Sequence, residues 1–216
     1  MSYMEIEWKE PEELEILALK IIGKHQPKAL EKPQAINILD FMTLACDEFG
    51  YEFKVWPLPK IGNQKALGCV DNKNKELVLD RDLVSEAATN HSWRFVAAHE
   101  LGHLVLHQHY FENNQTPYDY IEIENGFPTN KRLEWQANRF ASELLLPRKM
   151  VEQVVYSASL EHGITRNIGQ IYIDGKDYNY ETLNYISNAI ANEFTVSKTV
   201  AKIRLKELNI IIDKRT

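Results

Sequence analysis

Two histidines and a glutamate near the middle of the chain have the residue types and spacing of a metal-dependent hydrolase. His99, Glu100 and His103 form an H-E-x-x-H pattern, in which one helix presents two imidazoles to a zinc ion. Residues four apart on a helix lie about 6 Å apart on one face, so both imidazoles can reach one ion. Glu100 is rotated from that face by roughly 100°, which suits a general base that takes a proton from a metal-activated water. The pattern predicts a zinc site with His99 and His103 as ligands and Glu100 as the base.

A third protein ligand has to come from outside this pattern, and two nearby histidines are candidates. His109 has the outer spacing of the metzincin pattern H-E-x-x-H-x-x-G-x-x-H, but Leu106 occupies the position of the glycine that breaks the helix there. His107 shares the helical face of the first two histidines and lies a further turn away, too far for the same tetrahedral site. Neither histidine is therefore favoured as a ligand.

Glu134 is the other candidate for the third ligand. A carboxylate on a second helix packed against the first can complete a His2Glu zinc site. Asn138, one turn later on the same face, could accept a hydrogen bond from a ligand imidazole and fix its tautomer. Spacing alone leaves Glu134 open between a ligand and a surface charge, and Asn138 between a partner of the site and a solvent-facing residue.

The segments that carry these residues have the apolar periodicity of helices. The segment 92–107 is apolar nearly all round, which indicates a buried helix. Helical periodicity resumes over 131–146, where Pro147 stops it. Two further helices are expected over 12–22 and 34–49.

Between residues 51 and 79 the pattern changes to short alternating or apolar runs. The segments 66–70 and 76–79 flank a turn at 71–74, as expected for a hairpin. These runs predict a small, mostly antiparallel sheet and hence an α+β fold. The segment 82–89 is expected to be a short helix or turn.

The stretch from 111 to 130 mixes Asn, Pro and Gly with acidic and aromatic residues, so we expect a long surface loop between the two ligand-bearing helices. Its aromatic and acidic members include Tyr118, Asp119, Tyr120, Glu122, Glu124 and Phe127.

The C-terminal part is expected to form two helices around a turn near 194–196, resembling a helix-turn-helix. Basic residues outnumber acidic ones from 196 to 216, which would suit a phosphate backbone. The basic residues are Lys198, Lys202, Arg204, Lys206, Lys214 and Arg215. However, Val196, Val200, Ile203 and Leu208 form an apolar stripe that needs a packing partner. We favour packing over DNA binding for these helices.

Composition limits the remaining possibilities. The net charge of −6 argues against a protein whose whole surface binds nucleic acid, although a local basic patch is compatible with it. The N-terminus lacks a secretory signal pattern and no apolar run approaches a membrane span, so a cytoplasmic location is expected and a membrane role is not. Cys46 and Cys69 are expected to be small core residues. Two regions are expected, a peptidase domain at 1–150 and a helical region at 151–216.

These motifs together resemble the ImmA/IrrE family of metallo-endopeptidases. The resemblance rests on the H-E-x-x-H segment with its trailing Leu104-Val105-Leu106-His107, on 134–141 and on 144–147. It implies a minimal gluzincin-like zinc peptidase core and Glu134 as the third zinc ligand. It also implies cleavage of a helix-turn-helix repressor, and hence a role in gene regulation. The family often has Glu where this chain has Gln136, a position expected to lie near the site or at the surface.

Three classes of function follow from the sequence. The chain could be an active zinc endopeptidase, a DNA-binding regulator with a vestigial site, or a metal-dependent sensor that binds a partner with little peptidase activity. The intact Glu100 favours the endopeptidase.

Overall fold

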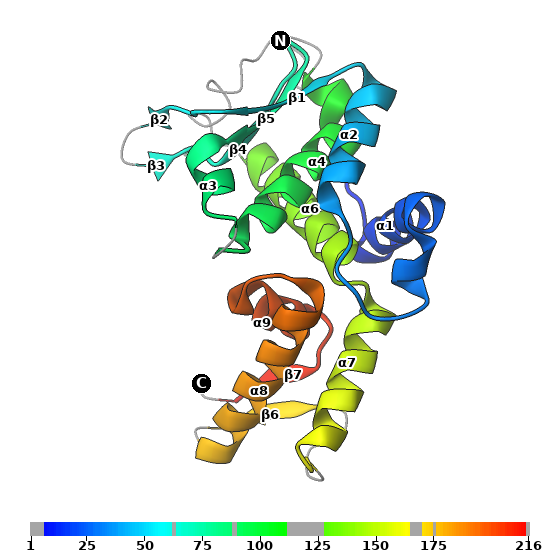
Figure 1. Cartoon of the computed structure of the whole chain (residues 1–216), viewed down its shortest axis with the longest axis vertical. Coiled ribbons are helices and arrows are strands. Elements are labelled where there is room, and N and C mark those ends of the chain that lie inside the picture. Colours follow the sequence, from blue (N-terminus) through cyan, green and yellow to red (C-terminus); the bar gives the residue numbers. More distant parts are fainter. Residues whose placement is uncertain are drawn as a thin grey trace. The chain divides into compact units, whose positions relative to one another are not determined.

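A computed structural model describes residues 7–61, 64–87, 90–111, 128–164, 170–174 and 176–214. The fold is mixed α+β, as expected (Figure 1). The chain forms two compact units, the first from 1–18 and 37–144 and the second from 19–36 and 145–216. The division into domains at residue 150 remains a prediction.

Most of the expected helices are present, several of them longer than the periodicity indicated. Those that contribute to the first unit are α1 (Pro11–His25), α2 (Ile38–Phe49), α3 (Arg81–Ser85), α4 (Ser92–Phe111) and α6 (Pro128–Leu145). Helix α1 continues into the second unit, where a 3-10 turn, η1 (Pro27–Leu30), follows it. Helix α2 ends at Gly50, whose φ of 71° is left-handed and favours glycine. Helices α4 and α6 both extend into the segment 111–130 that was expected as a loop. The rest of that segment, 112–127 with its aromatic and acidic residues, lies outside the described residues.

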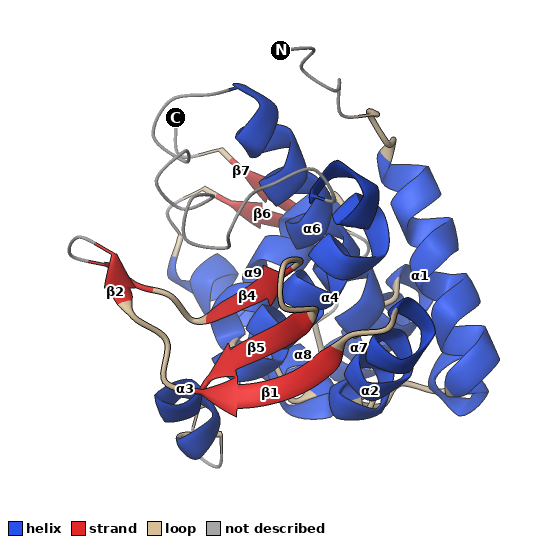
Figure 2. Cartoon of the chain, turned by 90° about the horizontal axis from the view of Figure 1, so that it is seen from above, coloured by secondary structure: helices blue, strands red, loops and turns tan. Residues whose placement is uncertain are grey.

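The central sheet has three strands in the order β1, β5, β4 (Figure 2). Strands β4 (Gly68–Asp71) and β5 (Glu76–Asp80) form the expected antiparallel hairpin. Strand β1 (Glu52–Trp56) pairs with the other side of β5 and runs parallel to it, so the sheet is mixed. The expectation of a mostly antiparallel sheet was wrong for this pair. The chain leaves β1 at one edge, crosses to the other edge to form β4, and then returns as β5 between them, parallel to β1. Within that connection, β2 (Lys60–Ile61) and β3 (Gln64–Lys65) form a short antiparallel pair.

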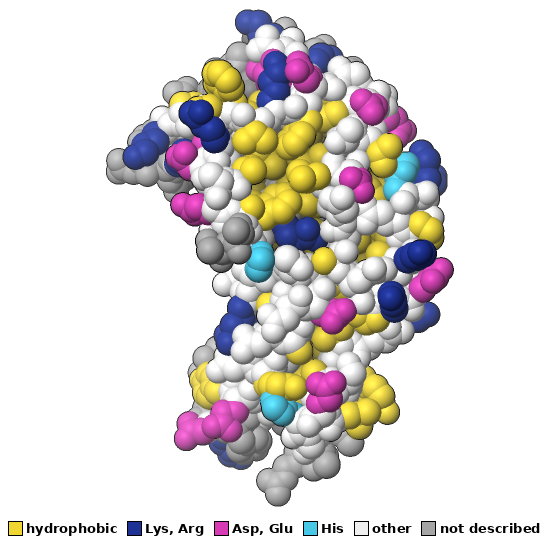
Figure 3. Space-filling model, viewed as in Figure 1, with side chains coloured by type: hydrophobic (Ala, Val, Ile, Leu, Met, Phe, Trp, Pro, Cys, Tyr) yellow, Lys and Arg dark blue, Asp and Glu magenta, His cyan; other side chains and the backbone are white. Residues whose placement is uncertain are grey.

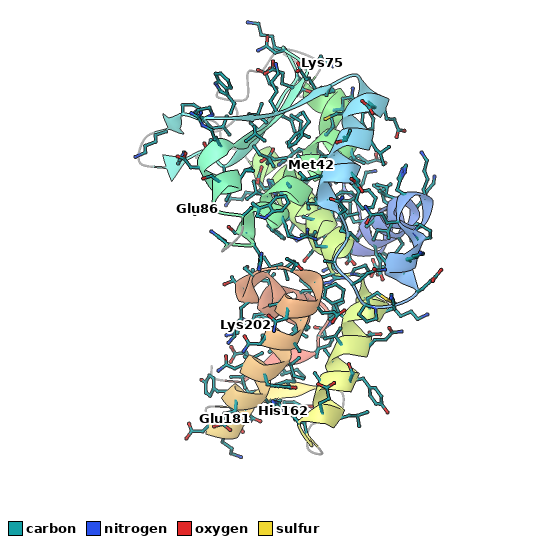
Figure 4. The ribbon with its side chains drawn as sticks, in the orientation of Figure 1. Met42, Lys75, Glu86, His162, Glu181 and Lys202 are labelled. Atoms are coloured by element: carbon teal, nitrogen blue, oxygen red, sulfur yellow. The ribbon has the colours of Figure 1, made fainter. Side chains whose placement is uncertain are left out.

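The core of the first unit lies where α2, α4, α6 and β5 meet. Its fully buried side chains include Ile38, Met42, Leu77, Leu79, Ala97, Leu101, Leu104, Leu133 and Phe140. Met42 points from α2 into this core (Figure 4). Both cysteines are buried and free, as expected. The helix that carries the histidine pattern is therefore held by apolar contacts on several sides.

The second unit contains the expected pair of C-terminal helices. These are α8 (Asp177–Phe194) and α9 (Lys198–Glu207), joined by a short turn at 195–197. Thr195 ends α8 with a left-handed φ of 53°, and the side chain of Ser197 caps α9 by accepting from the amide of Val200. Its other elements are α7 (Arg148–Glu161), β6 (Ile171–Ile173) and β7 (Ile211–Asp213), and the two strands pair in parallel.

Arg204 is buried in the second unit and is not part of its basic surface. Its Nε donates to the carbonyl of Leu146 at 2.9 Å, and its Nη1 lies 3.2 Å from Glu207. The apolar stripe is buried as expected except for Ile203, which is 48% exposed. Lys202 remains on the outer side of α9 (Figure 4). The prediction that the apolar stripe is used for packing is confirmed for three of its four residues. Arg204 does not contribute to a basic surface, because it is fully buried.

None of the helices within the described residues combines the length and apolar character needed to cross a membrane.

Candidate metal centre

His99 and His103 lie one turn apart on α4 and direct their Nε2 atoms toward the same point. These two nitrogens are 3.0 Å apart, and the ring planes are inclined by 79°. Two nitrogens bound at about 2.0 Å to a tetrahedral zinc would lie roughly 3.3 Å apart. The helical spacing alone therefore brings two donors to nearly the separation that one ion requires.

Helix α6 approaches α4 closely enough to add a third side chain. At the crossing, Gly102 faces Ala137, and a β-carbon on Gly102 would lie 3.2 Å from both Cα and the carbonyl oxygen of Ala137. Such contacts are tighter than side chains normally make, so the glycine and the alanine allow the two helices to pack backbone to backbone. Gly102 lies inside the histidine pattern and had no role in the sequence-based prediction.

Glu134, three residues before Ala137 on α6, points toward the two imidazoles. Its Oε2 lies 3.2 Å from Nε2 of His99, and its Oε1 lies 3.1 Å from Nε2 of His103. One donor atom from each of the three side chains can be chosen so that all lie within 4.8 Å of one another, a group that could hold a metal ion. It is the one such group of at least three His, Cys, Asp or Glu side chains among the described residues.

The hydrogen bond to His99 leaves its Nε2 available for a metal. Oδ1 of Asn138 lies 3.0 Å from Nδ1 of His99, a contact that was one of the two alternatives left open by the sequence. An amide oxygen only accepts, so Nδ1 carries a proton and Nε2 is the nitrogen of His99 that remains to bind a metal. Two imidazole nitrogens and a carboxylate that converge on one point are the donor set of a His2Glu zinc site.

The electrostatics of Glu134 and His99 favour a charged pair in the metal-free site. Burial acts to raise the pKa of Glu134, but hydrogen bonds and charge from His103 and His99 outweigh it and hold the pKa well below its usual range. Burial acts to lower the pKa of His99, and the neighbouring carboxylates of Glu134 and Glu100 outweigh that effect and raise it. The carboxylate of Glu134 is thus kept ionised and paired with positive charge.

Neither His107 nor His109 belongs to the converging group. His109 is exposed near the end of α4. His107 is buried, and its Nδ1 lies 3.1 Å from Nδ1 of His103. Burial, with the positive charge of His103, lowers the pKa of His107 to about 3.

Gln136 lies inside the protein beside the site, with 1% of its surface exposed. Its Oε1 is 3.0 Å from Nε2 of His107. This places it near the site, one of the two alternatives expected, and excludes the surface position. The contacts of His107 and Gln136 were missed from the sequence, although the spacing of four between His103 and His107 was a usable signal.

Glu100 is buried on the side of α4 that faces the sheet, beside the first residue of β4. A β-carbon at Gly68 would lie 2.6 Å from Cγ and 2.7 Å from Oε1 of Glu100. Burial raises the pKa of Glu100 above its usual value, although the positive charges of His99 and His103 oppose this. A raised pKa makes the protonated form easier to reach, which a group that takes up and then releases a proton requires. Gly68 was not singled out in the sequence, although a glycine within a strand often marks a close approach.

Comparison with family models supports the same chemistry. The model of the IrrE N-terminal-like domain of the M78 peptidases matches residues 83–206, more than half of the chain. The match includes α4, α6 and every side chain of the converging group. Comparison with curated proteins found no match.

Proposed function

The chain belongs to the ImmA/IrrE family of metallopeptidases, and from this premise we propose that it is a zinc endopeptidase that cleaves one specific protein partner. In this proposal His99, His103 and Glu134 hold the metal, Glu100 is the general base, and Asn138 orients His99. The observation that carries the proposal is the convergence of the three donor side chains beside the buried Glu100.

A zinc ion held there would act as a Lewis acid on the scissile carbonyl and on a water molecule. The side chains of the chain itself account for the remaining steps. Glu100 takes the proton of the attacking water and can then give it to the leaving amine, because burial has raised its pKa. Glu134 has its pKa held low, so it remains an anionic ligand and does not compete for that proton.

The sheet offers a place for an extended peptide beside the base. Strand β4 is an edge strand of the three-stranded sheet, and its Gly68 contacts Glu100. An edge strand has unpaired backbone groups to which an extended segment can hydrogen-bond. Exposed apolar side chains on or beside this sheet include Val55, Trp56 and Leu67. Apolar side chains also gather on the face of the first unit seen in Figure 3.

We propose that the partner is a helix-turn-helix repressor, whose cleavage would change gene expression. This finer assignment rests on the resemblance to the family and on the sequence between the two ligand-bearing helices. That stretch combines the aromatic residues Tyr118, Tyr120 and Phe127 with several acidic ones. Aromatic anchors within an acidic rim suit a partner with basic segments, such as a DNA-binding region.

The proposal is tested by incubating the zinc-loaded protein with the repressor encoded beside its gene and, separately, with casein. We expect a limited cut in the repressor and little digestion of casein. Glu100→Gln provides the matched control, because it removes the base, leaves the three ligands in place and should bind zinc normally. Ready digestion of casein with the repressor intact would refute the substrate assignment. Wild-type rates in Glu100→Gln would refute the mechanism.

A DNA-binding regulator or a metal-dependent sensor is less favoured by the described residues. Arg204, a fully buried cation of the C-terminal group, is bonded to Leu146 and Glu207. An intact base is not needed by a sensor that only binds. Retention of regulatory function in Glu100→Gln would favour these alternatives.

A further inference from the structure

We infer that His107 and Gln136 form a hydrogen-bonded relay that accepts the Nδ1 proton of His103 and so directs its Nε2 to the metal site. The relay begins at the backbone carbonyl of Glu7 and ends at Nδ1 of His103. This inference rests on the proposed role of His103 as a ligand, and it assigns positioning roles to two residues outside the ligand set.

The first step fixes the orientation of the Gln136 amide. One end of this amide lies 2.9 Å from the backbone oxygen of Glu7. A backbone carbonyl can only accept a hydrogen bond, so the group that faces it is the NH2 of Gln136. The amide oxygen, Oε1, therefore faces His107.

The second step fixes the proton of His107. Oε1 of Gln136 lies 3.0 Å from Nε2 of His107. Because an amide oxygen only accepts, Nε2 of His107 carries a proton. A neutral imidazole has one N–H, so Nδ1 of His107 has a lone pair and acts as an acceptor.

The third step reaches the proposed ligand. Nδ1 of His103 lies 3.1 Å from Nδ1 of His107. With His107 as the acceptor, Nδ1 of His103 is the donor and carries a proton. Its Nε2, on the other side of the ring, faces His99 and Glu134. The relay therefore leaves Nε2 as the nitrogen of His103 that can give up its proton to bind a metal.

Burial of His107 and Gln136 keeps water from replacing the hydrogen bonds of the relay. His107 is 3% exposed and Gln136 is 1% exposed, so exchanging these contacts for water is restricted. Leaving a buried donor or acceptor unpaired is unfavourable, so the paired arrangement is retained. The two histidines of the motif are thus oriented differently, His99 by the exposed Asn138 and His103 by a buried chain of partners.

Stacking holds the start of the relay against α6. The indole of Trp8 lies on that of Trp135, with ring centroids 4.8 Å apart and planes inclined by 17°. Nε1 of Trp8 also donates to Oε1 of Glu10 at 2.7 Å. These contacts keep the carbonyl of Glu7 next to the residue that follows Trp135.

Nitrogen-15 NMR of the histidine side chains in the metal-free protein tests the inference without any variant. The ring nitrogen shifts distinguish the two tautomers, and we expect a protonated Nε2 and a bare, accepting Nδ1 at His107, with a protonated Nδ1 at His103. A protonated Nδ1 at His107 in the folded wild-type protein would overturn the inference.

Zinc affinity, measured by competition with a chromophoric chelator, provides the second test. His107→Leu removes the acceptor and should weaken zinc binding roughly 10-fold to 100-fold. His107→Asn returns an acceptor oxygen near the position of Nδ1 and should recover part of that loss. His109→Leu, a matched change at an exposed position of the same helix, should leave the affinity unchanged.

The outcomes separate this inference from the proposed function. If the wild-type protein binds no zinc, the proposed function fails. If the wild type binds zinc and a folded His107→Leu binds it equally well, the relay is wrong and the proposed function stands. Should His107→Leu fail to fold, His107→Asn and the tautomer measurement decide the question.

Discussion

A β-carbon at Gly68 would stand 2.6 Å from Cγ of Glu100, so β4 leaves room for this carboxylate only because residue 68 has no side chain. The nearest atoms are all in the side chain of Glu100, which can move, and none belongs to the backbone of α4. Gly68 therefore shapes the position of the proposed base more than the packing of the helix.

Gly68→Ala is expected to lower peptide hydrolysis about 10-fold or more while the protein stays folded and binds zinc. A methyl group would displace the carboxylate of Glu100, and misplacing a reacting group by about 1 Å can cost about 100-fold in rate. Steady-state hydrolysis, zinc affinity and thermal unfolding should be measured together. Equal losses of zinc binding and of activity would contradict the prediction that Gly68 affects the base and leaves the metal site unchanged.

Glu134→Ala is expected to weaken zinc binding strongly, because it removes a carboxylate that lies within 3.2 Å of both histidines of the motif. His109→Ala should retain the metal. Metal analysis of the two purified variants after dialysis makes the comparison. Loss of zinc from His109→Ala with retention in Glu134→Ala would show that the ligand assignment is wrong.

Gly102→Ala is expected to destabilise the protein by about 1–3 kcal/mol and to weaken zinc binding, because the methyl group would press α4 away from Ala137. Gly23→Ala in α1 is the matched control. Its β-carbon would meet Cδ1 of Leu30 at an ordinary 3.6 Å, so the better helix propensity of alanine should stabilise it by up to about 1 kcal/mol. Urea unfolding of both variants tests the contrast, and equal effects would contradict it.

Asp80 should make part of the stability dependent on pH. Burial raises its pKa, but Lys65 and the amides of Leu58 and Leu83 outweigh this and hold the pKa below its ordinary value. The ionised form is therefore favoured in the folded state, and its contribution is present above the unfolded pKa of about 3.9. It is lost as the pH falls through the folded pKa.

Asp80→Asn removes this titration and should cost roughly 2 kcal/mol at pH 7. The gap in unfolding free energy between this variant and the wild type should stay constant above about pH 5 and narrow below pH 3.9. Urea unfolding of both proteins from pH 2.5 to 7 measures the gap. A gap that widens with acid would reverse the assigned sign.

Arg204→Lys should destabilise the protein by about 2 kcal/mol, because a lysine cannot reproduce the bonds to the carbonyl of Leu146 and to Glu207. Lys206→Ala, at an exposed position of the same helix, should change stability by less than about 0.5 kcal/mol. Thermal unfolding distinguishes the two. Similar losses of stability in both variants would contradict the claim that the buried bonds of Arg204 cause the effect.

The parts of the site that depend on local geometry could be predicted from the amino-acid sequence. Helical spacing brings His99 and His103 to one face and turns Glu100 away, because four residues make about one turn. The alternation around the turn at 71–74 determined the hairpin of β4 and β5 in the same local way. The assignment of Glu134 needed more than spacing, and as a ligand it remains a prediction.

Features that depend on contacts between distant segments could not be predicted in this way and became apparent in the folded chain. The approach of Glu134 to the histidines requires Gly102 to meet Ala137. The parallel pairing of β1 and the burial of Arg204 depend on where the chain returns after long connections. Gln136 and Gly68 acquire their contacts from Glu7 and Glu100, many residues away. Helical and strand periodicity record which face of an element is apolar, and they contain no information on which other element that face will meet.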